Sequence, residues 1–316
     1  MLKLGILIDA AAEVPQSVLD NPHVRLLPIT IQIDDQSFSD TRNAQATRDF
    51  NSQFLNMRAA EVSQSVPPTE AQIRQFFLDH IACEFDHVFG LFVMGSRSPI
   101  FKNAMAAASQ CITDSMPVRS KVGIKGPLFV ECYDSMNVLG GYGAQVMEAL
   151  REFGSETSVS TIRAHMKELS AKSYVYVAPS NLDFILTRAK SKGDNSVGKL
   201  GAMAAKVLGI MPVLRGFQNN TEAVTKVRGV AAAQDYIFNI TRRELQRGLL
   251  APFVNMAYSG PVEDVLRMPQ YAALKADCTA QNVQLNLQEM SPSTSINMGP
   301  NALTSGFIAK PHKPEL

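Results

Sequence analysis

The sequence contains no tryptophan, only four cysteines and almost no excess of either charge. Thirty Lys and Arg residues offset 29 Asp and Glu residues, which leaves a net charge of +1, and charged residues make up 19% of the chain. So small a net charge generates no strong field that would attract nucleic acid or an anionic membrane. Because no Lys- and Arg-rich run stands out either, we expect no nucleic-acid partner.

Widely spaced cysteines without a C-x-x-C pair argue against a structural zinc site or a disulfide framework. No stretch reaches the ~18 apolar residues that a membrane helix needs. The N-terminus begins like a signal peptide, but Asp9 interrupts its apolar run, so we interpret residues 4–8 as a buried strand. These features indicate a cytoplasmic protein with no bound metal, and they are compatible with a transient membrane contact. The cysteines are Cys83, Cys111, Cys132 and Cys278.

Hydrophobic residues make up 46% of the 316 residues, and a prior of roughly 150 residues per domain predicts two domains. Short apolar runs alternate with helical patterns, which is typical of βαβ units and a parallel sheet, so we expect an α/β fold. Runs that lack polar alternation suit a sheet covered on both faces. The predicted strands are residues 4–8, 24–33 (as one or two strands), 88–94, 128–132, 174–178, 211–214, 252–256 and 283–287.

Two helix starts stand out between these strands. Thr69 and Gln72 have the spacing of a capping box, and Ser98 is predicted as an N-cap followed by Pro99 at the first helical position. The domain boundary is expected near residues 171–173, which gives an N-terminal domain of residues 1–171 and a C-terminal domain of residues 172–316. The other predicted helices are residues 142–153, 161–169, 197–208 and 230–247.

No catalytic motif is evident. The five histidines form no H-E-x-x-H spacing, no G-x-S-x-G elbow is present, and the glycines of residues 140–143 are interpreted as close packing at a helix start. Polar helix starts remain, at Ser98 and around Ser65 and Thr69, where unpaired N–H groups and the helix dipole suit a carboxylate or a phosphate. A late polar turn at residues 297–301 offers amides to an anion or is an ordinary surface turn.

A series of segments, in the right order along the chain, resembles motifs of the DegV family of fatty-acid-binding proteins. The family's opening strand and D-S-x-x-D-L-P motif correspond to residues 6–15, and its T-S-Q-P-S motif corresponds to residues 65–69. The S-G-T motif falls on residues 98–100, and the H-x-G-P-G motif falls on residues 297–301. The remaining segments are residues 27–34, 39–40, 130–135, 182–196, 208–214 and 226–229.

The resemblance covers nearly the whole chain and implies a two-domain fold, with a parallel sheet in the N-terminal α/β domain and a mixed sheet in the C-terminal one. It implies that a long-chain fatty acid lies between the domains and is presented to a separate fatty acid kinase. On this reading the chain is a lipid-binding protein rather than an enzyme. The fatty acid is its ligand, and no cofactor is expected.

The resemblance also implies which residues hold the ligand's carboxylate. Carried over position by position, these are Ser65 for the family's threonine, Ser98 for its serine and Asn297 for its histidine. Asn can donate a hydrogen bond but cannot become charged, so the grip on a carboxylate should weaken unless Arg97 or Arg215 compensates. Further ligand contacts are expected from Thr69, Arg97, Pro99, Met298 and Gly299.

Two other functions stay open. An enzyme or binding protein for a small phosphorylated or carboxylated metabolite would use the same turns, with Asp9, Asp134 and Lys199 as candidate catalytic groups. An adaptor would present Lys190, Lys192 and Lys199 to a partner protein. Since each buried CH₂ of an acyl chain contributes ~0.8 kcal/mol, a carrier needs only a few polar groups to orient its ligand, which fits a chain without a catalytic constellation.

Overall fold

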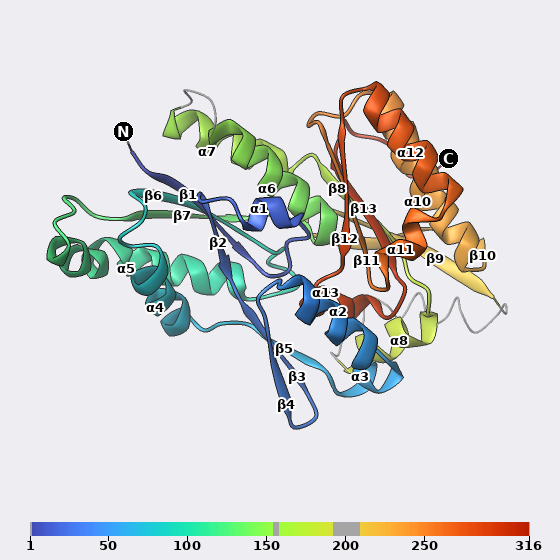
Figure 1. The fold of residues 1–316 in the computed structure, drawn as a ribbon, viewed down its shortest axis with the longest axis horizontal. Coiled ribbons are helices and arrows are strands. Elements are labelled where there is room, and N and C mark those ends of the chain that lie inside the picture. Colours follow the sequence, from blue (N-terminus) through green and yellow to red (C-terminus); the bar gives the residue numbers. More distant parts are fainter. Residues whose placement is uncertain (1, 154–157, 192–208, 316) are drawn as a thin grey trace.

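The computed structural model describes residues 2–153, 158–191 and 209–315. The predicted helix at residues 197–208 and most of the polar stretch at residues 191–196 lie outside these residues. Within them the chain forms three sheets, two of them large, with helix α6 (Leu139–Phe153) running between the two large sheets (Figure 1).

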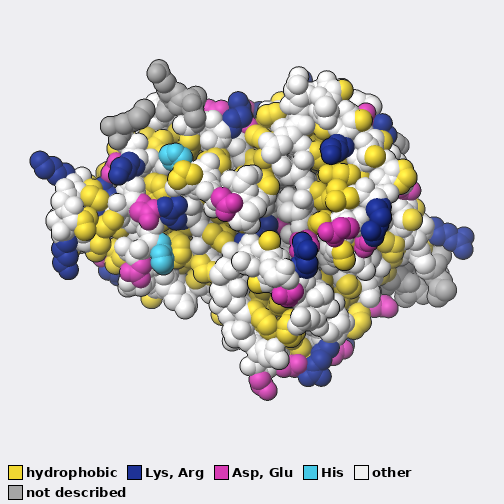
Figure 2. Space-filling view, viewed as in Figure 1, with side chains coloured by type: hydrophobic (Ala, Val, Ile, Leu, Met, Phe, Trp, Pro, Cys, Tyr) yellow, Lys and Arg dark blue, Asp and Glu magenta, His cyan; other side chains and the backbone are white. Residues whose placement is uncertain are grey.

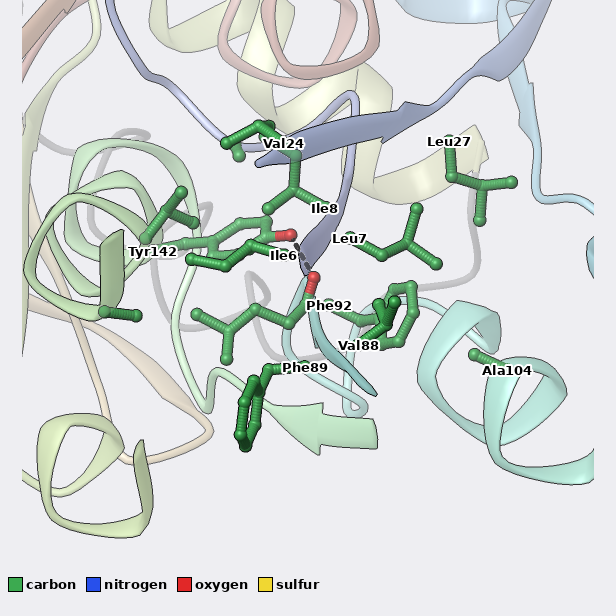
Figure 3. Packing of buried hydrophobic residues seen from close by; sticks show 14 of the residues in the cluster. Ile6, Leu7, Ile8, Val24, Leu27, Val88, Phe89, Phe92, Ala104 and Tyr142 are labelled. Carbon is green, nitrogen blue, oxygen red and sulfur yellow. Dashed lines mark hydrogen bonds between the residues drawn. The ribbon is translucent and has the colours of Figure 1, made fainter. Parts of the chain in front are cut away.

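The first sheet consists of four parallel strands in the order β2-β1-β6-β7. Its central strands are buried apolar runs because helices cover both faces, with α4 and α5 on one side and α6 and α7 on the other (Figures 1 and 3). β7 is an edge strand, so the predicted covered run at residues 128–132 is only partly covered: Leu128 is buried, Phe129 is exposed and the other residues are partly buried. The strands are β1 (Leu4–Asp9), β2 (Val24–Leu27), β6 (His87–Phe92) and β7 (Phe129–Asp134), and the helices are α1 (Gln16–Leu19), α4 (Glu70–His80), α5 (Ile100–Lys121) and α7 (Val159–Ser170).

Both predicted helix starts exist, and one is shifted by a residue. Thr69 and Gln72 form the expected reciprocal capping box of α4. At α5 the N-cap position falls on Pro99 rather than on Ser98, although the backbone angles of Pro99 (φ −77°, ψ −1°) are already helical, which is unusual for an N-cap residue. Ser98 Oγ accepts only a long, 3.4 Å hydrogen bond from Ile100 N, so its hydroxyl contributes little to capping.

The second sheet is mixed and has the order β10-β9-β8-β13-β11-β12, in which β11 and β12 alone are parallel neighbours. Helices α10 and α12 cover one face, and α6 packs on the other. The sequence pattern does not predict β10 and β13 as strands, because Thr, Ser, Asn and Lys interrupt their apolar residues. The elements are β8 (Ser173–Ala178), β9 (Ile210–Phe217), β10 (Asn220–Arg228), β11 (Phe253–Tyr258), β12 (Gln284–Glu289), β13 (Leu303–Ile308), α10 (Val230–Gln246), α11 (Val262–Leu266) and α12 (Pro269–Ala280).

The glycines of α6 allow that helix to approach backbone on both sides. A Cβ at Gly140 would overlap the carbonyl oxygen of Asn255, and a Cβ at Gly143 would overlap that of Glu13. Gly306 of β13 lies against the Gly140 backbone in the same way. The interpretation of these glycines as close packing is therefore confirmed. It also explains how one buried helix packs closely against two sheets.

A small antiparallel sheet, in the order β4-β3-β5, lies beside the two large ones. Residues 24–33 form two strands that belong to different sheets and are separated by Pro28, which has no N–H to continue a ladder. Four helices pack near this sheet around a third core of buried residues. The elements are β3 (Ile29–Ile33), β4 (Gln36–Asp40), β5 (Gln64–Val66), α2 (Ala44–Gln53), α3 (Met57–Val62), α8 (Leu182–Ser191) and α13 (Pro292–Met298).

The expected polar turn at residues 297–301 is only partly a turn. Asn297 and Met298 belong to the last turn of α13, and Gly299 is its C-cap with a φ of 82°. The predicted domain boundary falls between α7 and β8, where the chain enters the second sheet. Because α13 packs against α2, α3 and β3 from the first part of the chain, the division at residue 171 stays a prediction.

The surface agrees with the balanced composition. On the face shown in Figure 2, acidic and basic side chains are interspersed. Among the described residues no helix combines the length and apolar character needed to cross a bilayer.

Candidate functional site

A cavity of about 430 Å³ lies where all three sheets contribute residues. Its volume is within the ~300–1,000 Å³ that is usual for small-molecule sites. The loops after β1 and β6 supply Ala11 and Val93, the small sheet supplies Ile29 and Ser65, and the second sheet supplies residues of β8, β9 and β10. The first sheet thus contributes its carboxyl edge, which is where open α/β folds bind ligands.

One wall of the cavity is apolar. Val175 and Val177 of β8 face it, whereas the alternating Tyr174 and Tyr176 pack into the core on the α10 side. Leu214 of β9 pairs directly with Val177 and extends this wall. Ile185 and Ala189 lie one turn apart on α8 and also line the cavity.

A second part of the lining is the turn between β6 and α5, residues 93–98. Met94 N donates to Asn137 O, at 3.0 Å, and Gly95 N donates to the Asp134 carboxylate. Ser96 Oγ donates to Asn219 O, at 3.0 Å, in the hairpin turn of the second sheet. These contacts hold the turn in place from both large sheets, and they leave Ser98 half-buried at the cavity.

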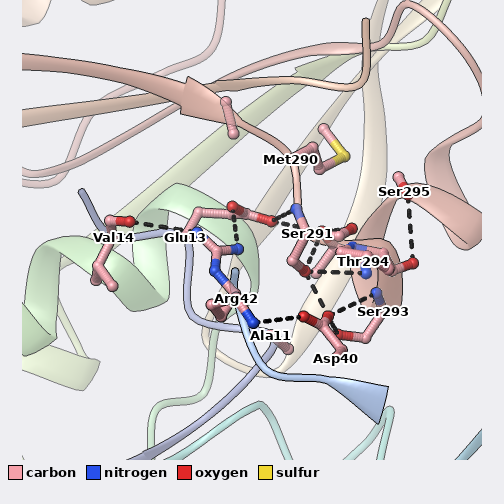
Figure 4. A network of polar contacts seen from close by, with 12 residues as sticks. Ala11, Glu13, Val14, Asp40, Arg42, Met290, Ser291, Ser293, Thr294 and Ser295 are labelled. Atoms are coloured by element: carbon pink, nitrogen blue, oxygen red, sulfur yellow. Dashed lines mark hydrogen bonds and ion pairs between the residues drawn. The ribbon is translucent and has the colours of Figure 1, made fainter. Parts of the chain in front are cut away.

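Helix α13 supplies a third part, with Ser293, Thr294, Asn297 and Met298. Its first turn is anchored on buried acidic residues from the N-terminal part of the chain (Figure 4). The Thr294 hydroxyl donates to Glu13 and the Ser293 hydroxyl donates to Asp40.

The residues predicted to hold the carboxylate are brought together. Ser65, Ser98 and Asn297 all line the one cavity, although they come from β5, from the loop before α5 and from α13. Ser65 Oγ has no hydrogen-bond partner among the residues that the structure describes, so its hydroxyl is available to a ligand. Asn297 Nδ2 donates to Ser293 O, at 2.9 Å.

The further predicted contacts divide into two groups. Arg97 and Met298 line the cavity, and Arg97 is exposed at its surface. Thr69, Pro99 and Gly299 are not part of the lining. Thr69 is occupied by the cap of α4.

Sequence reasoning missed Arg188, a cavity-lining residue of α8 that is only 3% exposed. Of the two arginines expected to compensate for Asn297, Arg97 lines the cavity, whereas Arg215 pairs with Glu222 across the β9–β10 hairpin and does not. A signal did exist, since Ile185 and Arg188 are three residues apart and share one helix face with Ala189. A charged residue on an apolar helix face indicates either a paired core residue or a ligand contact.

The candidate catalytic groups of the alternative enzyme function lie elsewhere. Asp9 is fully buried behind the cavity, where its carboxylate accepts hydrogen bonds from Ala11 N (2.9 Å) and Val93 N (2.7 Å). Burial raises the pKa of Asp9 to about 7. Asp134 accepts from Gly95 N and Met136 N, and Lys199 lies outside the described residues.

The charged residues of the described lining are Arg97 and Arg188, both cationic at neutral pH. The described walls of the cavity therefore combine positively charged side chains with several hydroxyls, and they include no carboxylate or imidazole side chain that could transfer a proton. A separate cluster of Glu148, Glu152 and His165 on α6 and α7 has donor atoms within 4.8 Å of one another. Arg151 already pairs with Glu148 there, so a cation is present without a metal.

Three comparisons bear on this site. The sequence matches the family model described as uncharacterised protein, DegV family, over residues 3–310. A DegV domain-containing protein of Xanthomonas campestris pv. campestris is 35% identical over 311 residues, which cover 98% of this chain and 99% of the relative.

Two solved structures have the same fold. DegV, a fatty acid binding protein from Bacillus subtilis, is 13% identical, with a TM-score of 0.73 and coverage of 98% of this chain and 100% of that chain. The fatty acid kinase (Fak) B3 protein of Streptococcus pneumoniae, loaded with linoleic acid, is 16% identical, with a TM-score of 0.70 and the same coverage. The predicted two-domain α/β fold is thereby confirmed. With a family match and a close relative that both span nearly the whole chain, the protein belongs to the DegV family.

Proposed function

We propose that this protein binds a long-chain fatty acid in the cavity between its sheets and presents the carboxylate to a partner such as a fatty acid kinase. The observation that carries the proposal is a single cavity that combines an apolar wall, built by β8, β9 and α8, with the polar residues Ser65, Ser98 and Asn297. The apolar wall buries the acyl chain, at ~0.8 kcal/mol per CH₂. The polar residues hold the carboxylate.

The relatives support the same ligand class. The structure from Bacillus subtilis is described as a fatty acid binding protein, and the protein from Streptococcus pneumoniae carries linoleic acid. That second protein is named as part of a fatty acid kinase, which supports a kinase as the partner. The protein acts as a carrier rather than as a catalyst. All four cysteines are free thiols, which is typical of a reducing compartment and supports placement in the cytoplasm.

Ligand binding is tested on the purified full-length protein. We expect an organic extract to contain a long-chain fatty acid by mass spectrometry, and the delipidated protein to take up hexadecanoate. Ser65→Ala and Ser98→Ala should each weaken hexadecanoate about 3- to 10-fold, the value of one modest hydrogen bond. Ser109→Ala, on the exposed face of α5, is the matched control. No lipid in the extract and no uptake by the delipidated protein would disprove the function.

The kinase step is tested separately. The hexadecanoate-loaded protein, a bacterial fatty acid kinase and ATP should together yield acyl phosphate, and omission of either protein should abolish the product. Product formed from free hexadecanoate at the same rate without this protein would show that it does not present the acid.

A further inference from the structure

Arg188 is an unusual arginine for its position in the fold. It lies on α8, lines the cavity and is only 3% exposed. Arginine is almost never fully buried unless it is paired, because removing its charge from water is costly. A buried arginine beside a ligand cavity therefore requires an account of what meets its charge.

The contacts of Arg188 leave that charge unmatched. Nη1 donates to the backbone carbonyl of Ser63, and Nε donates to Asn297 Oδ1 at 3.2 Å. Nη2 is buried and has no hydrogen-bond partner, and no carboxylate of the described chain lies within ion-pair distance of the guanidinium. Both of its partners are neutral.

Arg119 shows what a satisfied buried arginine looks like in the same molecule. It is 1% exposed, and its guanidinium donates to three backbone carbonyls and to the carboxylate of Asp86, at 2.6 Å. Each of its three nitrogens has a partner, and a carboxylate balances the charge. Arg188 lacks both features, so the missing partner is an anion with hydrogen-bond acceptors.

The neighbours of Arg188 locate that anion. Ser63 precedes the strand that carries Ser65, and Asn297 lies on α13, so the two contacts hold the guanidinium between two segments that line the cavity. Ser65 and Asn297 are also two of the three residues predicted to hold the head group. A ligand acid at this end of the cavity would meet Arg188 and these residues together.

We propose that Arg188 is the cationic anchor of the ligand's head group, and that it makes the cavity select ionised acyl ligands over neutral ones of equal length. The proposal rests on the proposed fatty-acid function and deepens it. Nη2 donates to a carboxylate oxygen, which gives a charge-assisted hydrogen bond in a site of low polarity. Neutral Asn297 then orients the guanidinium rather than supplying charge.

Protonation of Arg188 persists in this environment. Burial lowers its pKa to about 10, so the guanidinium stays charged at neutral pH. A histidine in its place would lose most of its charge above pH ~6.5. The charged groups around the cavity are Arg97 at its surface, Asp9, whose carboxylate accepts hydrogen bonds from the lining residues Ala11 and Val93, and the Glu13–Arg42 and Asp40 cluster beneath α13. The charge that Arg188 contributes should therefore not vary between pH 6 and 8.

The test compares two probes of equal chain length, hexadecanoate and hexadecanol, on the delipidated full-length protein. Arg188→Gln should weaken hexadecanoate about 10- to 100-fold, the range for a hydrogen bond to a charged group, and should change hexadecanol less than about threefold. Arg188→Lys should restore part of the loss because it keeps the charge. Arg215→Gln is the matched control, since this arginine pairs with Glu222 outside the cavity, and it should affect neither probe.

The outcomes separate this inference from the proposed function. If Arg188→Gln leaves hexadecanoate unaffected, or weakens both probes equally, Arg188 is structural and the inference fails while fatty-acid binding stands. If the wild-type protein binds neither probe, the proposed function itself fails.

A measurement on the wild-type protein covers the case in which the variant does not fold. Hexadecanoate labelled with ¹³C at the carboxyl carbon is titrated in the complex by NMR. A carboxylate beside an arginine should have a pKa about 1–3 units below its ordinary value. A bound carboxyl whose pKa lies above that of the free acid would overturn the inference.

Discussion

Arg42 Nη1 lies 2.7 Å from Glu13 Oε2, and both side chains are buried. The other oxygen of Glu13 accepts a hydrogen bond from Ser291 N, at 2.9 Å, although the two residues are 278 positions apart. Ser291 is the N-cap of α13, the helix that carries several cavity-lining residues. The ion pair thus fixes one wall of the cavity to the N-terminal part of the chain (Figure 4).

Removal of one member of this pair should strongly destabilise the protein. Glu13→Ala leaves Arg42 buried without a counter-charge, and we expect the free energy of unfolding to fall by about 3–5 kcal/mol, measured by urea denaturation. Asp34→Ala removes a partner of Arg58 on the surface, where both side chains are exposed, and should have little effect. Equal losses for the two variants would contradict a special role for the buried pair.

The buried carboxyl of Asp9 should make stability depend on pH. Burial raises its pKa from 3.8 to about 7, against opposing hydrogen bonds from Val93 N and Ala11 N. Between these two pKa values the folded protein binds more protons than the unfolded chain. The free energy of unfolding therefore falls as the pH rises from about 4 to 7, and the contribution of Asp9 does not change further above pH 7. The full change is on the order of 4 kcal/mol.

Asp9→Asn is the variant that isolates this effect. Its side chain cannot ionise, so the difference in unfolding free energy between the wild type and Asp9→Asn should vary across pH 4–7 and be flat above. Urea denaturation at a series of pH values measures it. A difference that is constant from pH 4 to 8 would show that Asp9 is ionised throughout this range.

The length of the apolar wall should set the length of the bound acyl chain. Val177 is 3% exposed and faces the cavity, so Val177→Phe should reduce hexadecanoate affinity by about tenfold or more, roughly the value of two buried CH₂ groups. The affinity for the shorter decanoate should fall less. Val66→Phe is the matched control, because Val66 lies next to Ser65 on β5 but is exposed and does not line the cavity.

Thr69 should contribute to the stability of the fold and not to ligand binding. Its hydroxyl caps α4 and it lies outside the cavity lining. Thr69→Ala should lower the free energy of unfolding by about 0.5–2 kcal/mol and leave hexadecanoate affinity unchanged by calorimetric titration. A loss of affinity without a loss of stability would instead place Thr69 at the ligand.

Local patterns predicted most of the strands and the α4 capping box. They failed where polar residues form buried or paired strands, as in β13, whose Thr304 and Ser305 are fully buried. Burial of those side chains depends on neighbours far along the chain, and a hydrogen bond such as Thr241 Oγ1 to Ser305 Oγ, at 2.9 Å, is invisible to local periodicity. The N-cap of α5 lies one residue after its predicted position, because the exact end of a helix depends on backbone angles that a sequence pattern does not fix.

The sequence by itself determined the α/β class and the family, because strand patterns, helix caps and motif order are local properties of the chain. Through the family resemblance it also predicted three residues at the head group. Only the tertiary structure decided that Ser65, Ser98 and Asn297 line one cavity and that Thr69 does not. It also revealed Arg188 as a buried cation without a counter-charge. The physical reason is that burial and ion pairing are set by segments that meet in space after long separations in sequence, whereas a linear pattern records only neighbours.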